Sequence, residues 1–205
     1  MAVKILTSQT EQQPPSLPEL SRRVAVLGGS NTEKSQLLLG LALRQTRQQR
    51  SVLCLDGRQQ KQTEVQFRLL LRGQHSYIAL PPGGAISQDV EQRVLSHMSQ
   101  GLTSQPPLLL LDAVLETTAW EQTLAFLLKA GVCVIELLAD ASHLTFGRYD
   151  TVLLLRMDEK AAELSSRAVG RRVDVSAIRE LPSGEGILLH LSQAWRVKLP
   201  AVRMD

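Results

Sequence analysis

Residues 24–35 read VAVLGGSNTEKS, and this stretch decides the fold. It begins with four apolar residues, Val24 to Leu27, which predict a short buried strand. The pair Gly28-Gly29 then ends the strand, because glycine accepts backbone angles that other residues avoid. Residues 34–47 follow with apolar side chains at helical spacing. The stretch therefore predicts a strand, a glycine turn and a helix in direct succession.

This succession carries most of a phosphate-binding loop, whose pattern is G-x-x-x-x-G-K-[ST]. The chain keeps Gly28, Lys34 and Ser35 of the four fixed positions, and it has Glu33 where the pattern has its second glycine. A carboxylate beside phosphate oxygens repels them, and a Cβ atom is unfavourable in a tightly wound loop. The pattern predicts a phosphate loop with one damaged position. The alternative is an ordinary turn between a strand and a helix.

The expected nucleotide contacts follow from how such a loop works. Successive backbone N–H groups point at the phosphates, and a helix begins beneath them. Lys34 would reach the β- and γ-phosphates of ATP, and the Ser35 hydroxyl would bind Mg²⁺. The predicted binding residues of the loop are Gly28, Gly29, Ser30, Asn31, Thr32, Lys34 and Ser35.

Apolar runs alternate with helical segments along the rest of the chain. Strands are predicted at 52–55, 77–80, 108–111, 132–138 and 151–155. Helices are predicted at 63–71, 86–101, 115–129 and 158–170, the last capped by Asp158. Residues 186–191 and 195–199 predict a closing β-hairpin. Continuous apolar strands between helices predict an α/β fold with a mostly parallel sheet that has helices on both faces.

Asp112 ends the apolar run 108–111, and ligands of such sheets bind beyond the carboxyl ends of the strands. We predict that Asp112 holds Mg²⁺ through water, as the acid of a second nucleotide motif. A hydrolytic motor usually has Glu directly after this acid to orient the attacking water, and this chain has Ala113 there. Glu116 is the remaining candidate for the catalytic base. The alternative for Asp112 is a cap on the helix that follows.

Asp140 follows the apolar run 132–138, at a place where a polar sensor of the γ-phosphate commonly lies. An anionic side chain is poorly suited to face a phosphate. We therefore expect Asp140 to cap the turn that follows it.

Length and composition set the limits for these expectations. The chain has 205 residues, 43% of them hydrophobic, which suits one soluble α/β domain, expected over 22–205. Residues 1–21 are rich in Gln, Ser, Thr and Pro and predict a flexible tail, not a signal peptide. No apolar run reaches the roughly 18 residues of a membrane span. Cys54 and Cys133 lie in apolar runs and predict buried hydrophobic residues. This use of cysteine fits a reducing cytoplasm, where we expect the protein.

Taken together, the motifs resemble the HerA–FtsK superfamily of DNA-pumping ATPases and secretion-coupling ATPases. Residues 24–35 look like its phosphate loop, and residues 52–56 look like its second strand, which often ends in Asp. Residues 150–156 and 161–170 are similar to its late strand and the helix after it. The segments LPSGEG (181–186) and WRVKLP (195–200) look like its closing hairpin. The matches are short, and they follow the same order over most of residues 22–203.

The resemblance implies a three-layer RecA-like P-loop NTPase core that usually assembles as a hexameric ring. It carries Lys34 and Ser35 over to phosphate and Mg²⁺, and Asp112 to Mg²⁺. The chain departs from the superfamily at Glu33, at Ala113 and at Asp140, where the superfamily tends to have Gln. All three departures affect the hydrolysis apparatus, while the pattern of the scaffold is kept.

These departures predict a P-loop protein with weak or no ATP hydrolysis, which binds ATP and Mg²⁺ weakly if it binds them. We expect it to act as a binding or assembly partner, for a paralogous ATPase or a DNA-processing or secretion-type complex, in a homo- or hetero-oligomer. One alternative is a divergent but active ATPase. Another is a DNA-binding protein that needs no nucleotide and uses basic residues: Arg171, Arg172, Arg196 and Lys198.

Overall fold

The computed structural model describes residues 23–59, 65, 67, 75–100, 106–115, 117–145, 147–191 and 193–200. The expected tail over 1–21 and most of the expected helix over 63–71 lie outside the described residues. No helix among the described residues is long and apolar enough to cross a membrane.

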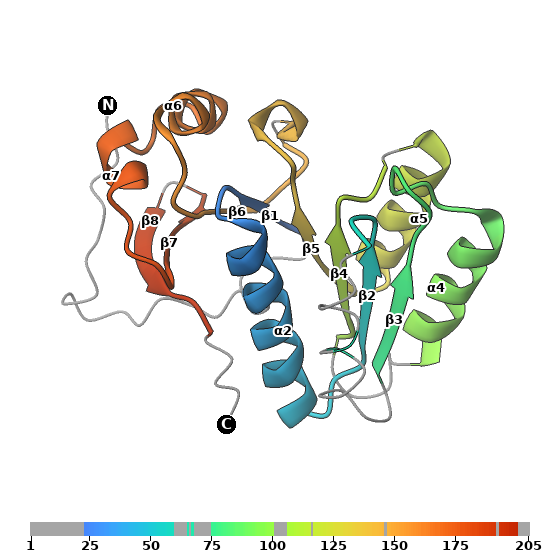
Figure 1. Cartoon of the computed structure of the whole chain (residues 1–205). Coiled ribbons are helices and arrows are strands. Elements are labelled where there is room, and N and C mark those ends of the chain that lie inside the picture. The colour runs from blue at the N-terminus through green and yellow to red at the C-terminus, as the bar shows by residue number, and fades with distance from the viewer. Residues whose placement is uncertain are drawn as a thin grey trace. The chain divides into compact units, whose positions relative to one another are not determined.

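Eight strands form one sheet in the order β3-β2-β4-β5-β1-β6-β7-β8 (Figure 1). Strand β2 pairs in parallel with β3 and with β4, and β1 pairs in parallel with β6. The last pairs, β6 with β7 and β7 with β8, are antiparallel. The strands are β1 (Arg23–Leu27), β2 (Val52–Asp56), β3 (His75–Ala79), β4 (Leu108–Asp112), β5 (Cys133–Leu137), β6 (Thr151–Leu154), β7 (Glu185–His190) and β8 (Gln193–Lys198). The expected α/β fold, with a mostly parallel sheet and a C-terminal hairpin, is confirmed.

The chain divides into two compact units, and each is described by itself below. One unit comprises residues 1–37 and 137–205, and the other comprises residues 38–136. Helix α2 (Asn31–Arg47) begins in the first unit and ends in the second. The single domain expected over 22–205 stays a prediction.

The unit of residues 1–37 and 137–205 holds β1, β6, β7 and β8. Helices α6 (Glu159–Ala168) and α7 (Val175–Arg179) and the short 3-10 helix η1 (Ala141–His143) belong to the same unit. Its core joins strand residues such as Leu27, Leu154 and Ile187 to helix residues such as Ala162 and Ile178. Asp158 caps α6 as expected, because its Oδ1 accepts a hydrogen bond from the Ala161 N–H at 2.8 Å.

The unit of residues 38–136 holds β2, β3 and β4 with helices α4 (Gln88–Gln100) and α5 (Thr118–Lys129). One face of its strands, with Leu53 and Leu109, packs against α4 and α5, whose Val94 and Trp120 are buried (Figure 1). Residues on the opposite face of the same strands, such as Cys54, are also fully buried. Strands that are buried on both faces need apolar side chains at every position. This explains the continuous apolar runs of these strands in the sequence.

Most predicted elements lie within a few residues of the observed ones. The helix predicted from Lys34 begins three residues earlier, at Asn31, and the helix predicted from Leu115 begins at Thr118. Helix α7 and the 3-10 helix η1 were not predicted, because five and three residues are too few for a helical repeat to be recognised. Cys54 and Cys133 are buried, as expected.

Candidate functional site

The turn between β1 and α2 is a closely packed glycine turn. Gly28 has φ +81° and Gly29 has φ +73°, in the left-handed region that favours glycine. A Cβ atom at Gly28 would lie 2.8 Å from the Leu155 carbonyl oxygen and 2.5 Å from the Met157 Cε atom. The Gly29 N–H donates to the Arg156 carbonyl oxygen at 2.8 Å. The residues that follow β6 therefore lie directly against this turn, and they take one of its N–H groups.

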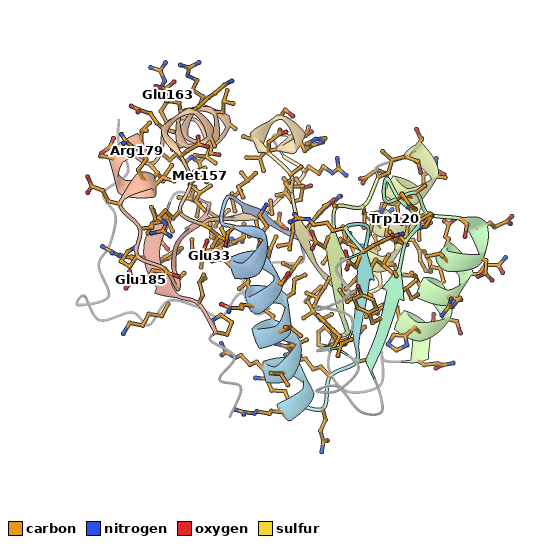
Figure 2. The ribbon with its side chains drawn as sticks, viewed as in Figure 1. Glu33, Trp120, Met157, Glu163, Arg179 and Glu185 are labelled. Atoms are coloured by element: carbon orange, nitrogen blue, oxygen red, sulfur yellow. The ribbon has the colours of Figure 1, made fainter. Side chains whose placement is uncertain are left out.

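Ser30 and Glu33 form a reciprocal pair at the start of α2. The Ser30 N–H donates to Glu33 Oε2 at 2.8 Å, and the Glu33 N–H donates to Ser30 Oγ at 3.1 Å. This arrangement is a capping box, which pairs N–H groups that a helix start leaves without partners. The carboxylate also lies at the positive end of the helix dipole. Glu33, expected only as damage to a phosphate loop, thus stabilises the beginning of α2 (Figure 2).

A second segment of the chain contacts the same carboxylate. Ser183 Oγ donates to Glu33 Oε1 at 3.3 Å, across 150 positions in sequence. Ser183 lies in the turn before β7, where the Glu185 N–H donates to the Pro182 carbonyl oxygen at 3.2 Å. The two carboxylate oxygens of Glu33 therefore have separate donors, one from the loop and one from this turn.

Lys34 and Ser35 are both buried in the first turns of α2. The Lys34 Nζ donates to the Leu138 carbonyl oxygen at 3.3 Å, directly after β5. Its backbone N–H donates to the Ser30 carbonyl oxygen at 3.0 Å, as in a helical turn. The side chains of Asn31 and Thr32 lie outside the described residues. The contacts of Lys34 and Ser35 with phosphate and Mg²⁺ stay predictions.

Asp112 is buried at the end of β4 and forms an ion pair with a nearby arginine. Its Oδ1 lies 2.7 Å from Arg58 Nε, and the Arg58 side chain is only 14% exposed. Asp56 builds the turn that places this arginine, because its Oδ1 accepts from the N–H groups of Arg58 at 2.7 Å and Gln59 at 3.2 Å. Tyr77 donates its hydroxyl hydrogen to the other oxygen of Asp56. A guanidinium thus stands beside the carboxylate that was expected to hold Mg²⁺ through water.

The buried carboxylates also influence a neighbouring thiol. Burial raises the pKa of the Cys54 thiol well above its ordinary value, and the charges of Asp112 and Asp56 raise this pKa further. Cys54 is therefore protonated at neutral pH and behaves as a buried hydrophobic residue.

The residue after Asp112 has an unusual backbone. Ala113 has φ +51°, and a Cβ atom at Gly57 or Gly84 would collide with its carbonyl oxygen. The Gly57 N–H donates to the Asp112 carbonyl oxygen, and the Leu115 N–H donates to the Gly84 carbonyl oxygen, both at 2.8 Å. Gly57 and Gly84 therefore pack against Ala113, the position at which a hydrolytic motor has its Glu. Glu116, the candidate base, lies outside the described residues.

The alternative that Asp112 caps the next helix is wrong. Thr117 is the N-cap of α5, and its Oγ1 accepts from the Trp120 N–H at 3.2 Å. Asp140, in contrast, is a cap as expected, because its Oδ1 accepts from the Ser142 N–H at 2.7 Å at the start of η1. The hydrogen bond from the Ser142 hydroxyl, followed by that from its N–H, lowers the pKa of Asp140.

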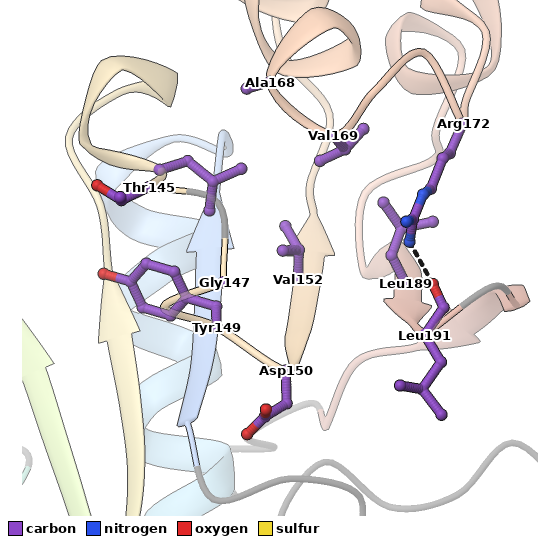
Figure 3. A pocket seen from close by; sticks show the side chains of 11 residues that line it. Thr145, Gly147, Tyr149, Asp150, Val152, Ala168, Val169, Arg172, Leu189 and Leu191 are labelled. Atoms are coloured by element: carbon purple, nitrogen blue, oxygen red, sulfur yellow. Dashed lines mark hydrogen bonds between the residues drawn. The ribbon is translucent and has the colours of Figure 1, made fainter. Parts of the chain in front are cut away.

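A cavity of about 500 Å³ lies near the start of β6, in the unit of residues 1–37 and 137–205 (Figure 3). Val152, Val169, Leu189 and other apolar side chains line it, together with Tyr149, Asp150 and Arg172. Because β1 and β6 are parallel, the glycine turn lies at the opposite end of these strands. The cavity therefore contains none of the residues predicted to bind nucleotide.

Two of the basic residues considered for DNA contact have partners within the chain. Arg172 donates through Nη1 to the Leu191 carbonyl oxygen (Figure 3). Arg196 forms an ion pair with Glu185. A partnered arginine at a DNA surface would have to exchange this partner for a phosphate. The structure therefore adds nothing that favours DNA contact at these two residues.

The fold has clear counterparts among solved structures. The DNA-packaging ATPase B204 from Sulfolobus turreted icosahedral virus superimposes with a TM-score of 0.67, covering 89% of this chain and 98% of B204 at 10% identity. The genome packaging NTPase B204 from Sulfolobus turreted icosahedral virus 2 superimposes with TM-scores of 0.63 in complex with ATP-gammaS and 0.62 in complex with sulfate. These two structures cover 90% and 89% of this chain, and 100% and 98% of their own, at 12% and 13% identity.

This chain has a P-loop NTPase-like fold. No family model matches its sequence, and no curated protein matches it either. At such low identity the likeness shows the fold alone. The resemblance inferred from short motifs thus agrees with the fold, and what the loop of this chain can do depends on its own residues.

Replacing Gly28 with Ala should destabilise the protein more than replacing Gly147 with Ala. Both glycines have φ +81° and belong to the same unit, so both changes carry a similar backbone cost of about 1 kcal/mol. Only Gly28 has a carbonyl oxygen close to the added atom, whereas Gly147 has nothing within 4 Å. We expect a further loss of about 1–3 kcal/mol for Gly28→Ala in denaturant unfolding. Equal losses would show that the turn is not closely packed.

Removing one member of the buried ion pair should lower the free energy of unfolding more than replacing both members. Arg58→Met leaves the Asp112 carboxylate buried without its guanidinium, with an expected loss of about 3 kcal/mol in the free energy of unfolding. The double variant Arg58→Met with Asp112→Leu replaces the pair by apolar side chains and should recover most of this loss. Denaturant unfolding of both single variants and the double variant measures the coupling. Simply additive losses would contradict the pair.

Proposed function

We propose that this chain is a catalytically degenerate P-loop ATPase-like protein, with weak or no ATP hydrolysis. In this proposal it is a cytoplasmic binding or assembly partner, in a homo- or hetero-oligomer, within a DNA-processing or secretion-type complex. The observation that carries the proposal is the hydrogen bond from the Ser30 N–H to the Glu33 carboxylate.

A phosphate loop binds its ligand through N–H groups that are free to point at it. In this chain the N–H of Gly29 is bound to the Arg156 carbonyl oxygen and the N–H of Ser30 to Glu33. A nucleotide would have to displace the carboxylate and would still bring phosphates close to it. Two like unit charges 4 Å apart near a protein surface repel by about 4 kcal/mol. These two contacts support a loop that binds phosphate weakly.

The residues at the end of β4, where the catalytic groups were expected, support the proposal separately from the loop. Ala113 has no group that could orient a water molecule. Asp112 already has a cationic partner, so Mg²⁺ would have to compete with Arg58. These features support loss of hydrolysis with retention of the fold, and a retained fold can still bind a partner.

The context of the proposed role comes from the resemblance and the superposition. The motifs resemble DNA-pumping and secretion-coupling ATPases, and the superimposed structures are a DNA-packaging ATPase and a genome packaging NTPase. A protein with this fold and no turnover suits a place beside an active paralogue. The second candidate is a divergent but active ATPase, which the retention of Lys34 and Ser35 at the loop favours.

Hydrolysis of ATP by the purified chain tests the proposal directly. We expect no Mg²⁺-dependent phosphate release above background, and no difference between the wild type and Lys34→Ala. Lys160→Ala, which removes an exposed lysine on α6, is the matched control for loss of one positive charge. Turnover that disappears in Lys34→Ala and persists in Lys160→Ala would establish the active ATPase instead.

The assembly part of the proposal needs its own measurement. We expect tagged wild type and Lys34→Ala chains to recover the same P-loop ATPase from the native host in equal amount, because partner binding does not depend on hydrolysis. Recovery that requires Lys34, or recovery of no ATPase by either chain, would contradict a hydrolysis-independent assembly role.

A further inference from the structure

We propose that the Glu33 carboxylate is an internal ligand of the phosphate loop, which holds the loop's anion site closed with the help of Ser183. This inference rests on the proposed function and explains how the degenerate loop is kept from binding phosphate. The residues concerned all belong to the unit of residues 1–37 and 137–205, and Figure 2 marks Glu33 at the start of α2.

The carboxylate makes the type of contact that a bound phosphate would make. Its Oε2 accepts a backbone N–H of the loop, from Ser30, at 2.8 Å. Its Oε1 accepts a side-chain hydroxyl, from Ser183, at 3.3 Å. It also lies at the N-terminal end of a 17-residue helix, where the helix dipole attracts negative charge. The Glu33 carboxylate therefore already supplies the negative charge at the start of α2 that a bound phosphate would supply.

Capping alone does not account for the contact with Ser183. A capping box needs only the serine at the N-cap and the glutamate three residues later. Ser183 comes from a distant turn whose position is set by the hairpin, since the Leu199 N–H donates to the Gly184 carbonyl oxygen at 2.8 Å. The start of the β7–β8 hairpin thus holds the carboxylate on the loop.

An internal ligand of this kind lowers the apparent affinity for any competing anion. The measured affinity equals the intrinsic affinity multiplied by the fraction of molecules in which the loop is free. Removing the charge of Glu33 removes both the competitor and its repulsion of phosphate oxygens. Removing the Ser183 hydroxyl leaves the charge and the cap in place, and it weakens only one hold on the carboxylate.

Inorganic tripolyphosphate, titrated calorimetrically into the full chain without Mg²⁺, is the probe for the closed site. We expect Glu33→Gln to bind it at least about tenfold more tightly than the wild type, because the amide can still accept from Ser30 but carries no charge. Glu33→Gly should gain at least as much affinity, with a lower melting temperature because the bond from the Ser30 N–H to the side chain of residue 33 is lost. Ser183→Ala should gain less than either, because the charge remains.

Two controls locate the effect. Glu163→Gln removes an exposed carboxylate on α6 of the same unit and should leave tripolyphosphate affinity unchanged. Lys34→Ala, added to Glu33→Gln, should abolish the gain, because it removes the buried ammonium of the same loop. The melting temperature of each variant shows that it is folded.

The outcomes separate this inference from the proposed function. If folded Glu33→Gln and Glu33→Gly bind tripolyphosphate no better than the wild type, the carboxylate is not closing an anion site, and lack of hydrolysis still stands. A gain in Glu163→Gln equal to that in Glu33→Gln would also overturn the inference, since any lost negative charge would then suffice. Lys34-dependent hydrolysis by the wild type would instead overturn the proposed function.

Discussion

The N–H groups at the start of α2 must be paired, and the arrangement of the phosphate-loop region depends on how this chain pairs them. In a phosphate loop a nucleotide is their partner. Here the carboxylate of Glu33 accepts from Ser30, and the carbonyl oxygen of Arg156 accepts from Gly29. Both partners come from the chain, so these two N–H groups are paired without a ligand. Close packing accompanies this pairing. Leu155, directly after β6, lies against Gly28, and it can do so only because Gly28 has no side chain.

A polar group of the predicted site is also paired within the chain in the unit of residues 38–136. The acid that ends β4 is buried, and a buried carboxylate needs a cation or several donors. Asp112 has the guanidinium of Arg58, which the turn built by Asp56 places beside it. In one unit a carboxylate accepts hydrogen bonds at a helix start, and in the other a carboxylate is paired with a guanidinium.

The strands, most helices and the closing hairpin could be predicted from the sequence, because burial on both faces leaves continuous apolar runs and turns leave glycines. The caps at Asp158 and Asp140 could also be predicted, since a short acidic side chain before a helix or turn has one main use. The role of Glu33 was missed although its signal is local: Ser30 and Glu33 have the spacing of a capping box, but the phosphate pattern covers the same residues. Arg58 had no signal, because its contact with Asp112 depends on a turn in which Gln59 has φ +54°. The spacing of residues along the sequence does not contain that geometry.

The backbone at Ala113 has a consequence for how such a protein changes over generations. Its carbonyl oxygen is held between Gly57 and Gly84, and its own φ is +51°. Any residue other than glycine at position 57 or 84 would bring a Cβ atom to within 2.2 Å of this oxygen. Selection for stability alone therefore removes mutations at these two positions. They will vary little in descendants of this chain, whether or not the protein turns over ATP.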